Sequence, residues 1–109
     1  MRYWLYNKPT DMRKSFFSLS GIVANEMNKE INSGDVFIFL NKTRTRIKLL
    51  HMEQGGLVLY CKILDAGTFL RPDNLSGGKM TWRDLVMMVE GIVENPTHRR
   101  KCIKFLRDK

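Results

Sequence analysis

The chain has 109 residues, which suffices for one domain with a modest core and leaves no room for a second independent core. Its 19 Lys and Arg residues outnumber 11 Asp and Glu residues, and the formal net charge of +8 favours polyanionic partners: nucleic acid first, then acidic protein or membrane surfaces. No apolar run approaches the ~20 residues of a membrane helix and no leader-like segment opens the chain, so we expect a cytoplasmic protein. The two cysteines, Cys61 and Cys102, lack CxxC spacing and predict neither zinc nor redox chemistry.

A strand, a helix and a second strand are predicted in the N-terminal part of the chain. Residues 3–6, YWLY, are mostly aromatic, and this composition predicts a short strand. Pro9 should end the strand because proline lacks an amide donor. Thr10 or Asp11 is then expected to cap a helix by accepting a hydrogen bond from a free backbone amide. Residues 36–40 are apolar on both faces and predict a central strand. The helix is predicted from apolar side chains at helical spacing, namely Met12, Phe16, Leu19, Val23 and Met27.

The second half of the chain predicts an antiparallel meander followed by a helix. Polar turns at 41–45 and 53–56 separate the strand at 36–40 from strands at 46–52 and 57–64. Residues 65–78 are rich in turn residues, with one short strand expected around Phe69, and Thr81 is the expected N-cap of a helix through Ile92. We therefore predict an α+β fold in which two helices cover an antiparallel meander of three to five strands. The predicted domain is 1–94, followed at 95–109 by a basic extension that forms a tail or a short helix.

Four stretches of the sequence carry a family resemblance. Residues 9–16, PTDMRKSF, join the first strand to the helix, and residues 34–50, GDVFIFLNKTRTRIKLL, form a basic strand-turn-strand. Residues 62–69, KILDAGTF, and residues 80–81 followed by 89–92, VEGI, complete the set. In this order and spacing they resemble the small TnpB-type accessory protein, the second open reading frame product, of the insertion sequence 66 family of bacterial mobile elements. The resemblance implies a part in transposition beside a separate transposase, without a defined chemical step.

The predicted hairpin has one basic side. Alternation along a strand should direct Arg44, Arg46 and Lys48 to one face, while Ile47 and Leu49 point toward the core. Successive cations would then lie about 7 Å apart, near the spacing of phosphates along one DNA strand. The hairpin is therefore predicted to bind DNA.

Neighbouring residues extend this predicted DNA-binding side. Lys42 lies at the turn, and Lys62 is expected to join from the adjacent strand. Thr43 and Thr45 can donate neutral hydrogen bonds to phosphate oxygens, which position a duplex without reading its sequence. The alternative is that these cations only solvate the outer face of a half-covered sheet.

Two further basic segments belong to the predicted interface. Arg13 and Lys14 lie at the expected start of the helix, where a bound anion would relieve their repulsion from the positive end of the helix dipole. The alternative for this pair is a salt bridge to Asp11 or Asp35. The extension is either a nucleic-acid arm, a helix docked through its apolar side or a frayed terminus. Its candidate DNA-binding residues are Arg99, Arg100 and Lys101.

The sequence does not favour an enzyme. Nuclease and strand-transfer sites need several carboxylates that converge on Mg²⁺ or Mn²⁺, whereas the acidic residues here are scattered through turns and caps. His51 and His98 each stand alone, and the glycine pairs at 55–56 and 77–78 lack the context of a phosphate loop. We therefore expect no catalytic residues, cofactor, metal or small-molecule substrate. Large aromatic side chains are expected mostly in the core, with stacking on unpaired bases as the alternative, for Trp4, Tyr6, Tyr60 and Trp82.

We interpret the chain as a non-catalytic accessory protein for DNA transposition that binds DNA through the hairpin and the tail. The alternative is a protein-interaction subunit that recruits or stabilises the transposase of the same element, with the positive charge serving an acidic partner surface. A metal-dependent nuclease is the third and weakest interpretation. Three features depart from the family pattern. Ile63 stands where an Arg is usual, and the turn at 51–55, HMEQG, stands where the family tends to have an aromatic residue and an Asp before glycines. Phe17 stands where a polar residue is common and marks a candidate partner-binding surface.

Overall fold

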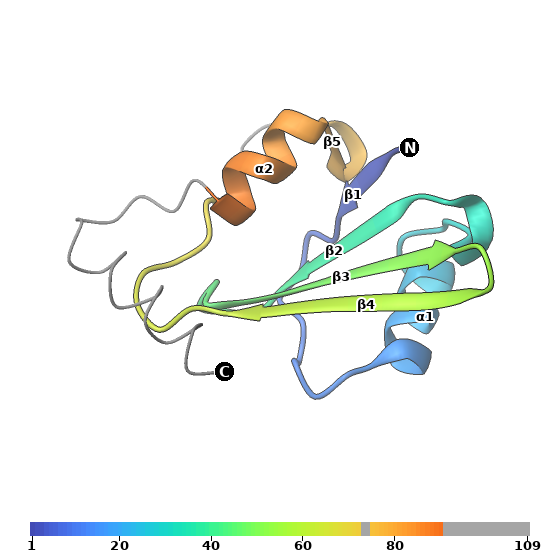
Figure 1. Ribbon diagram of the computed structural model, residues 1–109, viewed down its shortest axis with the longest axis horizontal. Coiled ribbons are helices and arrows are strands. Elements are labelled where there is room, and N and C mark those ends of the chain that lie inside the picture. Colours follow the sequence, from blue (N-terminus) through green and yellow to red (C-terminus); the bar gives the residue numbers. More distant parts are fainter. Residues whose placement is uncertain (73–74, 91–109) are drawn as a thin grey trace.

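The computed structural model describes residues 1–72 and 75–90, which form one mixed sheet with a helix on each face (Figure 1). The strands lie in the order β4-β3-β2-β1-β5, so the predicted α+β fold is confirmed. Two 3₁₀ turns, η1 (Ile31–Ser33) and η2 (Ser76–Gly78), connect the larger elements. Those elements are β1 (Tyr3–Leu5), α1 (Phe16–Asn25), β2 (Val36–Leu40), β3 (Arg46–Glu53), β4 (Gly56–Ile63), β5 (Lys79–Met80) and α2 (Trp82–Glu90).

The meander of β2, β3 and β4 is antiparallel as predicted. The sheet is not antiparallel throughout, however, because β1 is parallel to β2. β1 pairs parallel to β2, with Tyr3 opposite Val36 and Leu5 opposite Ile38. The reason is the connection, because the chain leaves β1, passes through α1 and returns to the same end of the sheet before β2 begins. β5 completes the sheet by pairing antiparallel with β1.

Both faces of the sheet are covered, which explains why β2 is apolar at every position. Phe37 and Phe39 point to one face, where they pack with α1 residues such as Leu19. Ile38 points to the opposite face, where it packs with α2 residues such as Met88. All five residues of β2 are buried, and the sheet therefore separates two apolar clusters.

A buried carboxylate fixes the start of β2 to β1. The Trp4 indole Nε1 donates to Asp35 Oδ2 over 3.0 Å, and Arg2 Nε lies 3.3 Å from the same carboxylate. Burial on its own raises the pKa of Asp35, but the hydrogen bonds from Trp4 and Arg2 outweigh it and hold the pKa below its ordinary value. Asp35 therefore remains charged inside the fold at neutral pH.

The first helix begins later than predicted. α1 starts at Phe16, and neither Thr10 nor Asp11 caps it. The chain before it continues alongside β2, because Tyr6 N donates to Ile38 O and Thr10 N donates to Leu40 O over 2.8 Å. Residues 10–14 are thereby held near the sheet and are not free to coil.

The second helix has the predicted cap. Asp84 N donates to Thr81 Oγ1 over 3.0 Å, and Thr81 N donates to Asp84 Oδ2 over 3.1 Å, a reciprocal capping pair. The expected end at Ile92 lies outside the described residues. The strand expected around Phe69 is wrong: the short strand is β5, while the buried Phe69 side chain belongs to the α2-side cluster.

Candidate nucleic-acid interface

The turn between β2 and β3 is held together by Asn41. Its Oδ1 accepts hydrogen bonds from Thr45 N at 2.9 Å and Arg46 N at 3.0 Å, and its Nδ2 donates to Thr45 Oγ1 over 3.1 Å. The hydroxyls of Thr43 and Thr45 lie 2.9 Å apart, so one of the two predicted phosphate donors gives its hydrogen to the other within the turn. An Asn followed by alternating Thr residues is a sequence signal for such a turn. The sequence analysis placed Asn41 in a turn but did not predict that its side chain would hold the turn together.

This turn presents the exposed cations Lys42, Arg44 and Arg46. Arg44 has a left-handed backbone with φ of 57°, so it belongs to the turn and the strand alternation predicted for it is wrong. Arg46 opens β3 on the α1 side of the sheet, opposite in direction to its buried neighbour Ile47. Within residues 1–72 and 75–90, none of the three side chains forms an ion pair. We call Lys42, Arg44 and Arg46 the turn cations.

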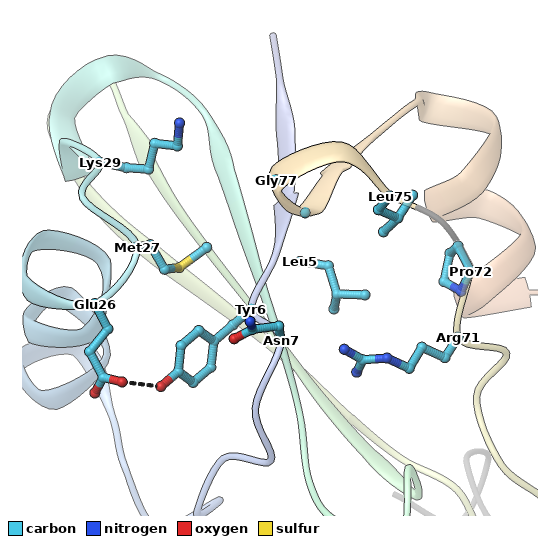
Figure 2. Close-up of a pocket in the computed structure, with 11 residues that line it drawn as sticks. Leu5, Tyr6, Asn7, Glu26, Met27, Lys29, Arg71, Pro72, Leu75 and Gly77 are labelled. Carbon is cyan, nitrogen blue, oxygen red and sulfur yellow. Dashed lines mark hydrogen bonds between the residues drawn. The ribbon is translucent and has the colours of Figure 1, made fainter.

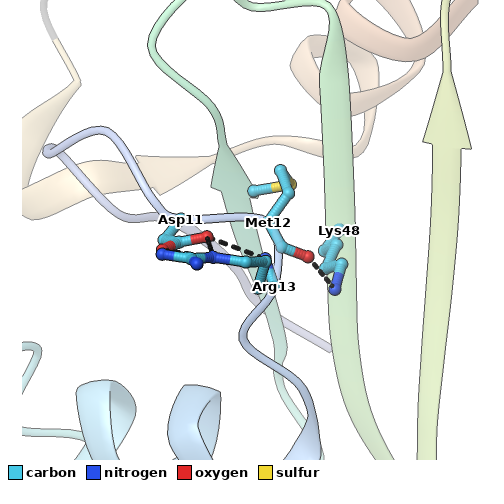
Figure 3. A network of polar contacts seen from close by, with 4 residues as sticks. All are labelled: Asp11, Met12, Arg13 and Lys48. Atoms are coloured by element: carbon cyan, nitrogen blue, oxygen red, sulfur yellow. Dashed lines mark hydrogen bonds and ion pairs between the residues drawn. The ribbon is translucent and has the colours of Figure 1, made fainter.

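Lys48 lies on the same face as Arg46 but is occupied. Its Nζ donates to Met12 O over 2.8 Å (Figure 3) and also to Lys14 O over 2.6 Å. The ammonium thus fastens the segment before α1 to β3. Sequence reasoning placed Lys48 among the phosphate contacts and did not predict this contact between two basic segments distant in sequence.

Arg13 is paired within its own segment. Its Nη2 lies 2.7 Å from Asp11 Oδ2, and its backbone N donates to Asp11 Oδ1 over 2.9 Å (Figure 3). The Arg13 hydrogen bonds hold the pKa of Asp11 far below its usual range. The salt-bridge alternative is therefore confirmed with Asp11, whereas Asp35 pairs with Arg2. Because Lys48 binds Lys14 O, Lys14 also lies beside β3.

Lys62 lies on the opposite face from Arg46 and Lys48. It is paired with Ile47, and cross-strand partners share a face of the sheet. Lys62 Nζ donates to Val89 O of α2 over 3.4 Å. The expectation that Lys62 joins the other hairpin cations is therefore wrong. The remaining predicted contacts, Arg99, Arg100 and Lys101, lie outside the described residues.

A pocket elsewhere is lined by two cations, Lys29 and Arg71. It lies between β1, the end of α1 and the segment around η2 (Figure 2). The Tyr6 hydroxyl donates a hydrogen bond to the Glu26 carboxylate. Burial is the larger cause and this hydrogen bond the second, and together they raise the pKa of Tyr6 to about 12. Lys29 Nζ lies 3.7 Å from the centre of the Trp4 ring, so its charge is also engaged.

Two of the aromatic side chains expected in the core are on the surface. Trp4 and Tyr6 are buried, but Tyr60 and Trp82 are 45 % and 63 % exposed. Trp82 instead packs its ring at 5.8 Å from that of Tyr3. In the same described part of the chain, no three His, Cys, Asp or Glu side chains gather as metal ligands would. No helix there is long and apolar enough to cross a membrane.

Sequence comparisons identify a matching family and similar proteins. The sequence model of the family described as IS66 Orf2-like protein matches residues 1–99. The uncharacterized protein y4jC of Sinorhizobium fredii (strain NBRC 101917 / NGR234) is 25 % identical over 93 residues, covering 84 % of this chain and 80 % of that protein. The uncharacterized protein y4hO of the same strain is 30 % identical over 77 residues, covering 71 % of this chain and 67 % of that protein. No solved structure matches the chain.

Proposed function

The chain belongs to the IS66 Orf2-like family, and on that premise we propose that this transposition-associated accessory protein acts without catalysis by binding DNA through its turn cations. The observation that carries the proposal is that Lys42, Arg44 and Arg46 are exposed, without ion pairs in the described part of the chain, and mounted on a turn that Asn41 holds in shape. A preformed turn loses little backbone entropy when its cations bind phosphates, so the ordering cost is confined to the side chains.

Arg13 and Lys14 extend the proposed surface. Lys48 draws their segment against β3, on the face where Arg46 also lies. The Arg13 side chain is 91 % exposed despite its pairing with Asp11, so it still faces solvent. Contacts of this kind position a duplex and carry no sequence preference of their own.

The test is a titration of duplex DNA at several salt concentrations. The triple variant Lys42→Ala, Arg44→Ala, Arg46→Ala should lower the slope of log affinity against log salt by about 2 to 3, since each lost phosphate contact accounts for about 0.9. A second triple variant, Arg71→Ala, Lys79→Ala, Arg83→Ala, removes the same charge from elsewhere and is the matched control. Equal effects of the two triple variants would refute the assignment of the turn, because net charge alone would then explain binding.

One observation favours a second candidate function, that of a subunit that binds the transposase of the same element. Phe17 is 93 % exposed and its neighbour Phe16 is 43 % exposed, on the outer side of α1. Exposed aromatic side chains commonly anchor protein interfaces. Co-purification with that transposase should be lost with Phe17→Ser and kept with the turn triple variant, while DNA affinity shows the reverse pattern.

A further inference from the structure

The two edges of the sheet differ greatly in length. β5 has two residues, whereas β4 has eight and forms the opposite edge beyond β3. Proteins commonly protect long edge strands with prolines, bulges or several charges, because unpaired backbone groups recruit further strands. β4 contains no proline and a single charged residue, Lys62, whose ammonium is already directed to Val89 O.

The outward-facing backbone groups of β4 can be identified from its pairing with β3. Leu64 N donates to Thr45 O over 2.8 Å, in the same register that places Lys62 opposite Ile47 and Tyr60 opposite Leu49. In an antiparallel ladder alternate residues point to the same neighbour, so the even-numbered residues of β4 bond to β3. No backbone bond among the described residues reaches the outer row, which consists of Leu57, Leu59, Cys61 and Ile63.

The side chains along this edge are apolar and accessible. Val58, Tyr60 and Ile63 are 42 %, 45 % and 41 % exposed, and Cys61 is exposed as well. Leu57 and Leu59 are only partly buried, where they pack against the apolar cluster on the α1 side of the sheet. A partner strand would therefore cover apolar surface on both faces as well as pair the backbone.

The outer row is symmetric about Tyr60. If a second copy of β4 runs antiparallel with Tyr60 opposite Tyr60, Leu59 lies opposite Cys61 of the second copy. Leu57 then lies opposite Ile63, so every outward amide and carbonyl of the row is paired. Lys62 lies opposite Val58 in this register, which separates the two like charges.

We propose that the protein forms a two-fold symmetric dimer in which β4 pairs antiparallel with β4 of a second copy, centred on Tyr60, to give one continuous sheet. Such an interface is isologous, because the same strand supplies both sides. The inference does not depend on DNA binding, since β4 contains none of the turn cations. The dimer would carry two copies of the basic turn.

Cysteine cross-linking tests the register. In a background with Cys61→Ser and Cys102→Ser, Tyr60→Cys places two thiols in a central non-hydrogen-bonded pair with Cα atoms about 4.5 Å apart, within the range of a disulfide. Val58→Cys, at a similarly exposed position on the same face, places its thiols about 14 Å apart along the strands. With oxidised glutathione as the oxidant, Tyr60→Cys should form a covalent dimer at least ten times faster than Val58→Cys. Equal rates would overturn the proposal.

Sedimentation of the full chain tests the dimer without cysteine chemistry. The unmodified protein should shift from monomer to dimer with increasing concentration. Cys61→Lys places two charges against apolar neighbours in the seam and should raise the dimer dissociation constant at least tenfold, while the matched control Thr68→Lys leaves it unchanged. A monomer at all concentrations up to 100 times that used for DNA titration, or equal effects of the two lysines, would overturn the proposal. A circular dichroism spectrum of each variant excludes unfolding as the cause.

Discussion

The turn cations and the cations around them have the same charge and different surroundings. Lys42, Arg44 and Arg46 have no ion-pair partner within residues 1–72 and 75–90. Lys48 binds two backbone carbonyls, and Lys62 reaches a carbonyl of α2. A basic strand pattern therefore contains two populations of cations, one available to a ligand and one that stabilises the fold.

The largest effect is expected from removing the Lys48 ammonium. Lys48→Met keeps an unbranched side chain of nearly the same length and leaves Met12 O and Lys14 O without their charged donor. Hydrogen bonds to charged groups contribute about 2 kcal/mol, so we expect the free energy of unfolding to fall by about that amount. Urea denaturation measures it. Arg46→Met is the control, and its stability should stay within about 0.5 kcal/mol of the unmodified protein because its side chain is an exposed one.

A smaller loss of stability is expected from substituting Asp35, whose negative charge accepts hydrogen bonds from Trp4 and Arg2. Its pKa is lowered on folding, so its contribution is present above the ordinary value of about 3.9 and is lost as the pH falls through the folded value. Asp35→Asn should cost about 1 kcal/mol at pH 7, and the difference from the unmodified protein should shrink as the pH falls below the ordinary value of about 3.9. Denaturation at a series of pH values measures it. A difference independent of pH would show that the ionised form of Asp35 is not what stabilises the fold.

Much of the fold follows from the sequence because its signals are local. Alternation and apolar character place β2, β3 and β4 within a residue or two of their observed bounds, and Thr81 with Asp84 marks the start of α2. The parallel pairing of β1 and the late start of α1 depend on hydrogen bonds between distant residues, such as Thr10 N to Leu40 O. Sequence patterns reflect only residues that are close together in the chain, so they do not predict these long-range hydrogen bonds.

The candidate site was predicted less completely for the same reason. Residue type identifies a cation, but whether it is free depends on what the fold brings near it. Lys48 meets Met12 O and Lys14 O from a segment more than 30 residues away, and Lys62 meets α2. Only the Arg13–Asp11 pair, two residues apart, was among the alternatives that the sequence offered.

Single substitutions of Arg46 and Lys62 test whether free cations bind DNA and cations held by the fold do not. The two residues lie on neighbouring strands, β3 and β4, but they point to opposite faces of the sheet. Arg46→Ala should reduce the slope of log affinity against log salt by about 0.9, as for one lost phosphate contact. Lys62→Ala should leave the slope unchanged. Titration of one duplex with both variants gives the answer, and equal changes in slope would mean that the face of the sheet does not determine which cations bind.

The smallest effect is expected from releasing a cation that is held. Asp11→Asn keeps the oxygen that accepts from Arg13 N and removes the negative charge that pairs with the guanidinium. If Arg13 lies in the interface, this variant should bind DNA about threefold more tightly at low salt, because the freed guanidinium can contact phosphate. In the double variant with Arg13→Ala the gain should disappear. A gain that persists without Arg13 would come from net charge alone and would place Arg13 outside the DNA-binding surface.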